Sequence, residues 1–129
     1  MKKILVVASD KAEIKGLGGD FLTLVSGVGP IFAAARASGE IVKTGAEVVV
    51  SVGTCGSMGR IKRGEVVSFS TVVTPDQDLS AMHLSLGTTI DWNRSTIKEL
   101  RTADRKSGLT LLSSGTFTSS YRDVFSSFS

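Results

Sequence analysis

Short runs of apolar residues, separated by polar or glycine-rich stretches, set the pattern of the chain. Strands are predicted over residues 4–7 and 47–52, because residues 4–7 and 48–50 are apolar without alternation, which is typical of strands buried on both faces of a sheet. Further strands are predicted over residues 21–25, 66–73 and 109–112. Five short strands are therefore expected.

A helix is predicted after the second strand, from Pro30 to the residue before Gly45. Proline fits the first helical turn, where its missing N–H would be unpaired, and glycine is a common stop signal. Side chains at helical spacing predict the face that packs on the sheet: Ile31, Ala34, Ala35, Ser38, Ile41 and Val42.

The remaining segments are mostly polar. Residues 11–20 predict a loop or a short helix, and a second helix is predicted from about Ser95, as N-cap, to Lys106, with Gly108 as its stop. Strands that alternate with helices favour an α/β layer fold.

The last apolar residues of the sequence predict one more helix. Their spacing of i, i+3, i+4 and i+7 places them on one helical face: Tyr121, Val124, Phe125 and Phe128. A helix with that much apolar area at a chain end normally packs under something that follows. We therefore expect residues 1–129 to form a single domain that is truncated at its C-terminal end.

Length and composition narrow the class of protein. A chain of 129 residues fits one domain, and 41% hydrophobic residues exclude intrinsic disorder. A single cysteine, Cys55, excludes an intrachain disulfide and favours a reducing, cytoplasmic setting. No apolar run reaches the length of a membrane span, so no membrane partner is expected.

The net charge of +3 raises the question whether the protein binds nucleic acid. The densest basic clusters, residues 60–63 and 101–106, contain no interleaved aromatic residues. Such clusters are more typical of solvated faces, and no nucleic-acid partner is predicted.

Three strand ends combine glycine with serine or threonine: residues 26–29, 53–57 and 114–116. In α/β sheets, ligands bind outside the carboxyl ends of the strands. Turn chemistry alone explains one such segment, whereas three at successive strand ends favour a binding site.

A dinucleotide site is the first alternative, because Gly27-Val28-Gly29 opens a helix. The full fingerprint needs a third glycine or alanine where Phe32 stands, and an acid where the next strand ends in Ser51-Val52-Gly53. Neither is present, so no nicotinamide or flavin cofactor is expected, and no metal site is predicted.

Six short stretches follow one another in a recognisable order. They are Glu13, nine residues after Ile4; Ser26-Gly27-Val28-Gly29 before Ala33 to Ala35; Val52-Gly53-Thr54-Cys55-Gly56; Ile61-Lys62-Arg63-Gly64-Glu65-Val66-Val67; Asp76-Gln77-Asp78-Leu79-Ser80-Ala81-Met82; and Ser114-Gly115-Thr116-Phe117. Together they resemble the purine nucleoside phosphorylase/uridine phosphorylase superfamily, and within it the 5′-methylthioadenosine/S-adenosylhomocysteine nucleosidases.

The resemblance implies a three-layer α/β fold around a mixed, mostly parallel central sheet, incomplete at the C-terminus. It also implies cleavage of the N-glycosidic bond of a purine nucleoside through a ribosyl cation, captured by water or by phosphate. Glu13 would hold and polarise the water, while Gly29 and Thr54 would line the anion or water pocket. From its residue type alone, Glu13 is equally well a solvated acid in a polar loop.

The same resemblance assigns four further substrate contacts. Cys55 and Gly56 would face the base and ribose through backbone atoms, and Phe117 would stack on the base. Met82 matches a position lent to a neighbouring subunit's pocket, which implies a homodimer. The Cys55 thiol is more typical of a small packing group than of a nucleophile.

Two departures from the family pattern bear on the reaction. Ser51 stands where phosphorylases of the bacterial type carry an arginine, and Pro30 stands where the family pattern has a lysine, so the site favours water over phosphate. The family's acidic general acid lies beyond Ser129. We therefore expect a hydrolase, with a nucleoside phosphorylase and a catalytically inactive nucleoside-binding module as alternatives.

Overall fold

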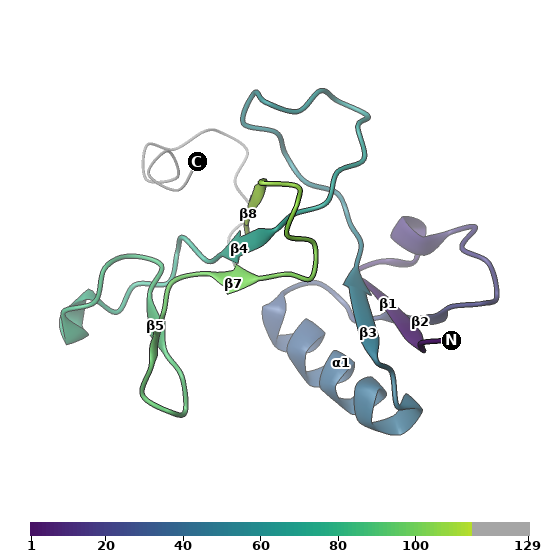
Figure 1. The fold of residues 1–129 in the computed structure, drawn as a ribbon, viewed down its shortest axis with the longest axis horizontal. Helices are drawn as coiled ribbons and strands as arrows, with labels where there is room; N and C mark the ends of the chain where they lie inside the picture. The colour runs from purple at the N-terminus through teal and green to yellow at the C-terminus, as the bar shows by residue number, and fades with distance from the viewer. Residues whose placement is uncertain (115–129) are drawn as a thin grey trace. The chain divides into compact units, whose positions relative to one another are not determined.

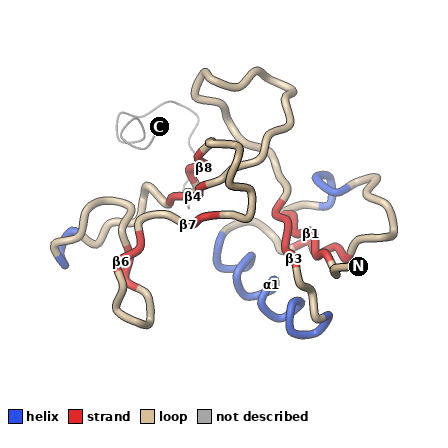
Figure 2. Tube along the Cα trace, viewed as in Figure 1, coloured by secondary structure: helices blue, strands red, loops and turns tan. Residues whose placement is uncertain are grey.

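The computed structural model describes residues 1–114; residues 115–129, which include the predicted helix around Tyr121–Phe128, lie outside the description. The described chain is an α/β protein, as predicted, and it contains one α-helix and several short strands (Figures 1 and 2). It divides into two compact units, residues 1–56 and 57–129, which are described separately. One domain over the whole chain stays a prediction.

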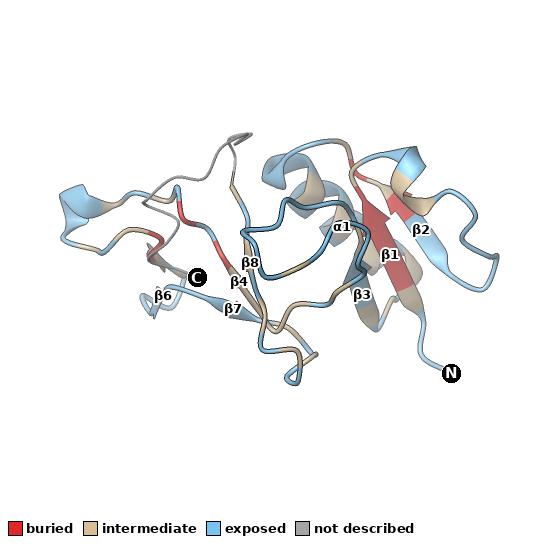
Figure 3. Cartoon of the chain, turned by 90° about the horizontal axis from the view of Figure 1, so that it is seen from above, coloured by how far each residue is buried: buried red, intermediate tan, exposed pale blue. Residues whose placement is uncertain are grey.

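The first unit is built on a three-stranded parallel sheet. Its strands are β1 (Ile4–Ala8), β2 (Leu22–Val25) and β3 (Val48–Ser51), in the order β2-β1-β3. Leu5 of β1 pairs with Leu22 on one side and with Val49 on the other. These strands confirm the first three predictions. The central strand β1 is the most deeply buried part of this unit (Figure 3).

The predicted bounds of the first helix are also confirmed. Helix α1 (Pro30–Thr44) has proline in its first turn and ends at Gly45, whose N–H donates to the Ile41 carbonyl at 2.9 Å. Gly45 has a φ of 70°, a left-handed conformation that glycine adopts at little cost.

The face that α1 turns to the sheet differs from the predicted one. Ala37 and Ile41 pack against the core formed by Leu5, Val7 and Leu24. Of the predicted stripe, Ile41 is correct, but Ile31, Ala34, Ala35, Ser38 and Val42 are exposed. The two partly buried positions, Ala37 and Ile41, are four residues apart. The small side chain of Ala37 lets the helix backbone approach the strands.

Two glycine substitutions test this account of α1. Gly39→Ala should raise the free energy of unfolding by about 0.5–1 kcal/mol, because a Cβ there meets nothing within 4 Å and alanine favours helix. Gly45→Ala should lower it by about 1–2 kcal/mol through left-handed strain. Urea denaturation of both variants checks the opposite signs, and two shifts in the same direction would contradict the assigned helix end.

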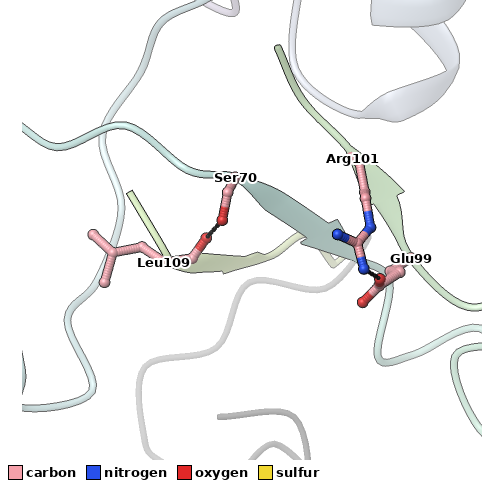
Figure 4. Close-up of polar contacts among 4 residues, drawn as sticks. All are labelled: Ser70, Glu99, Arg101 and Leu109. Atoms are coloured by element: carbon pink, nitrogen blue, oxygen red, sulfur yellow. Dashed lines mark hydrogen bonds and ion pairs between the residues drawn. The ribbon is translucent and has the colours of Figure 1, made fainter. Parts of the chain in front are cut away.

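The second unit contains a mixed three-stranded sheet. Strands β4 (Thr71–Val73), β7 (Leu100–Arg101) and β8 (Thr110–Leu112) lie in the order β7-β4-β8, with β4 parallel to β8 and antiparallel to β7. Next to this sheet, the Ser70 hydroxyl donates to the Leu109 carbonyl at 3.2 Å, and Arg101 pairs with Glu99 at 3.0 Å (Figure 4). Because β4 begins only at Thr71, the strand predicted over 66–73 is shorter than expected.

The helix predicted over residues 95–106 is wrong. Strands β5 (Thr89–Ile90) and β6 (Thr96–Ile97) form an antiparallel hairpin across this region instead. The Asp91 carboxylate accepts the backbone N–H groups of Asn93 and Ser95 at 2.9 and 2.8 Å. Ser95 thus closes a hairpin turn rather than capping a helix, because aspartate side chains stabilise such turns.

Side-chain bonds farther along the same segment also compete with helix formation. The Thr102 hydroxyl donates to the Phe69 carbonyl at 2.6 Å, and Asp104 accepts the Lys106 N–H at 3.0 Å. The local bond to Asp104 disfavours a continuous helix, and the bond from Thr102 ties the segment to a residue 33 positions earlier. No helix among residues 1–114 has the length and apolar character to cross a membrane.

Candidate functional site

The three strands of the first unit end at the same edge of its sheet, because all three run parallel. Ser26, directly after β2, donates its N–H to the Ala8 carbonyl at 2.9 Å, and Val52, directly after β3, donates to the Val7 carbonyl at 2.9 Å. The ends of β2 and β3 are thereby tied to the end of β1. This carboxyl edge carries two of the three predicted glycine-rich segments.

A short 3-10 helix, η1 (Lys11–Ile14), brings Glu13 to this edge. Asp10 caps it: the Asp10 carboxylate accepts the Ala12 N–H at 2.8 Å, and Glu13 Oε2 accepts the Asp10 N–H at 3.2 Å. This reciprocal pair is a capping box, which fixes the first turn of a helix. The prediction of a loop or short helix over 11–20 is confirmed.

Ser9 holds the Glu13 carboxylate more firmly than the cap alone. Its backbone N–H and its hydroxyl both donate to Oε2, at 3.0 and 2.9 Å. The Ser9 hydroxyl is the largest cause that lowers the pKa of Glu13; partial burial opposes it, and backbone hydrogen bonds from Asp10, Ser9 and Thr54 add to the lowering. Glu13 is therefore a carboxylate at neutral pH, able to accept a proton but not to supply one.

Gly53 leaves space for the other carboxylate oxygen of Glu13, Oε1. A methyl group added at Gly53 would lie 3.3 Å from Glu13 Oε1, tighter than an ordinary van der Waals contact. The carboxylate therefore packs directly on the backbone that follows β3. The structure thus brings together two of the residues that were predicted to share a site, Glu13 and Thr54.

Gly29 lies at the same edge, four residues after the end of β2, as the N-cap of α1. Its φ of 101° favours glycine, and no side chain caps the first turn of the helix. The backbone N–H groups of an uncapped first turn attract an anion or a polar oxygen. The place of Gly29 in an anion or water pocket stays a prediction.

The other predicted contacts are placed less closely. Thr54, Cys55 and Gly56 follow β3 and are exposed, with the Cys55 thiol free. Met82 ends η2 (Ser80–Met82) in the second unit and is 56% exposed, while Phe117 lies outside the described residues. Within residues 1–114, no three histidine, cysteine or acidic side chains gather as a metal site.

Sequence reasoning missed Ser9, and it placed Gly53 in a glycine-rich strand end without its contact to Glu13. The spacing Asp10-x-x-Glu13 is a capping-box signature, and it predicts that the Glu13 side chain folds back toward the residues before the helix. Ser9 is the next donor in that direction. Nothing in the sequence shows that Gly53, forty residues later, lies against the same carboxylate.

The lowered pKa of Glu13 makes a prediction about stability and pH. Because the folded pKa lies below the ordinary value of 4.5, the charged group stabilises the fold above about pH 4.5. That contribution is lost as pH falls through the folded pKa. Glu13→Gln should therefore lower the free energy of unfolding by about 1 kcal/mol at pH 7, and by less at pH 3.5. Urea denaturation at both pH values measures this, and a difference that does not change with pH would contradict it.

No protein-family model, curated protein or solved structure matches this chain.

Proposed function

We propose that this chain carries the nucleoside- and water-binding part of an N-ribosyl hydrolase that acts on a purine nucleoside of the methylthioadenosine or S-adenosylhomocysteine type. The proposal includes a three-layer fold with a mostly parallel sheet. One observation carries it: Glu13 is held as a carboxylate against the Gly53–Thr54 backbone at the carboxyl edge of a parallel sheet.

The proposed chemistry needs a fixed negative charge beside the sugar. As the bond from C1′ to the base nitrogen breaks, positive charge develops on the ribose, and an attacking water must lose a proton. A carboxylate in place stabilises that charge and accepts the proton. A lowered pKa keeps Glu13 charged beside the developing cation and leaves it no proton for the departing base, so the proposal makes Glu13 the base and not the general acid.

Water is the proposed acceptor because neither Ser51 nor Pro30 offers a positive charge at the sheet edge. A nucleoside phosphorylase is the second candidate, favoured by the uncapped first turn of α1, which can attract phosphate. The third is an inactive nucleoside-binding module. Met82, at 56% exposure, is free to contact a second subunit, in keeping with a proposed cytoplasmic homodimer.

Release of adenine from methylthioadenosine, measured with and without phosphate, tests the proposal. Release that does not depend on phosphate supports the hydrolase, and release that requires phosphate supports the phosphorylase. Binding of methylthioadenosine without release supports the inactive module. If the protein neither binds methylthioadenosine nor releases adenine from it, the proposed function is overturned.

A further inference from the structure

The two oxygens of the Glu13 carboxylate have different surroundings. Oε2 accepts three hydrogen bonds, from the Ser9 N–H, the Ser9 hydroxyl and the Asp10 N–H, at 3.0, 2.9 and 3.2 Å. Oε1 lies over Gly53, where glycine leaves room that a methyl group would fill. A carboxylate oxygen has two lone pairs, so three donors saturate Oε2. By the same count the backbone hydrogen bond from Thr54 takes one lone pair of Oε1, and the other lone pair of Oε1 is left to bind a ligand.

Ser9 supplies more than the cap requires. The capping box consists only of the hydrogen bonds made by Asp10 and Glu13, so neither hydrogen bond from Ser9 is needed to start η1. Ser9 directly follows β1, the central strand of the sheet, and is therefore held by a rigid element. The Ser9 N–H and hydroxyl, which both donate to Oε2, therefore hold the Glu13 carboxylate in a fixed position.

We propose that Ser9 is the positioning residue of the candidate site: it saturates Oε2 and thereby directs Oε1 of Glu13 toward a water or sugar hydroxyl above Gly53. This inference rests on the proposed hydrolase. The role belongs to the Ser9 hydroxyl, because its backbone N–H survives any substitution except proline. A misdirected carboxylate loses rate rather than binding, since alignment matters most in the transition state.

Ser9→Ala and Ser9→Thr form the central test, with Gly19→Ala as a control. A Cβ at Gly19 meets nothing within 4 Å, and that residue takes no part in the site. Two quantities are measured in the full chain: the pKa of Glu13, from carbon NMR of its carboxyl group, and kcat and KM for methylthioadenosine across pH. Ser9→Ala should raise the pKa, lower kcat about tenfold or more with little change in KM, and move the acidic limb of the rate profile upward.

The conservative variant separates positioning from packing. Ser9→Thr keeps the hydroxyl and should restore both the pKa and kcat, whereas a site that needed only a small side chain would tolerate alanine better than threonine. Gly53→Ala provides a complementary change, because it crowds Oε1 at 3.3 Å and leaves the Oε2 donors in place. It should lower kcat without the upward shift of the acidic limb.

Failure of this inference differs from failure of the proposed function. If the wild-type chain neither binds methylthioadenosine nor releases adenine, the proposed function falls, and with it a positioning role for Ser9. If the wild type is active but Ser9→Ala keeps its kcat and pH profile, the hydrolase stands and the role of Ser9 is overturned.

Discussion

Glu13→Gln is expected to lower kcat for methylthioadenosine cleavage by at least about 100-fold, the usual cost of removing a general base. Glutamine keeps the size of the side chain but removes its charge, so it can neither accept the proton of water nor stabilise a ribosyl cation. Binding of methylthioadenosine should change much less, because the proposed contacts to its base come from other residues and glutamine keeps one side-chain oxygen as a hydrogen-bond acceptor. Initial rates of adenine release, together with calorimetric titration of the same protein, measure the two effects.

Glu40→Gln is the matched control for this variant. It makes the same chemical change in the same unit, on helix α1, and no part of the candidate site uses it. Its kcat should stay within twofold of the wild type. Circular dichroism on both variants shows whether they are folded. Equal activity in a folded Glu13→Gln protein would remove Glu13 from the mechanism.

Leu5→Ala is expected to have the largest effect on stability, with a loss of about 2–5 kcal/mol, the range for leucine in a packed core. Leu5 is 0% exposed, lies on the central strand, and contacts both the neighbouring strands and α1 through the core cluster. A loss of this size is a large part of the stability of a small unit. Urea denaturation followed by circular dichroism measures it.

Val42→Ala serves as the comparison for Leu5→Ala. Val42 is 86% exposed on α1, so its truncation removes no buried area and should change stability by no more than about 0.5 kcal/mol. If Leu5→Ala cost as little as Val42→Ala, the packing of α1 on β1 would be contradicted.

The first unit was largely predictable because its signals are strong and agree with one another. Apolar runs mark the three parallel strands, and Pro30 and Gly45 mark both ends of α1. Only the inward face of α1 was wrong, since the spacing that packs a helix on strands depends on where those strands lie. Exposed Ile31 and Val42 fit the same apolar period as buried Ile41.

The second unit was harder to predict because its strands are two or three residues long. Such strands are too short for a period to appear, and bonds distant in sequence determine them. The bond from Thr102 to Phe69 joins residues 33 apart. Helix-like composition over residues 95–106 was therefore outweighed by the hairpin turn at Asp91.

The candidate site was predicted in part. Resemblance selected Glu13, and the structure places it beside Thr54, although its partners Ser9 and Gly53 emerged only from the geometry. Met82 and Phe117 stay predictions, because one belongs to the second unit and the other lies outside the described residues.

The central place of β1 has a consequence for biosynthesis. This strand pairs with β3, and Ile4 meets Val48 only after more than forty further residues have been translated. At roughly 5–20 residues per second, the apolar strand waits several seconds on the ribosome for its partner. During that interval the edge of β1 that pairs with β3 stays open, and slower translation between the two strands would lengthen its exposure.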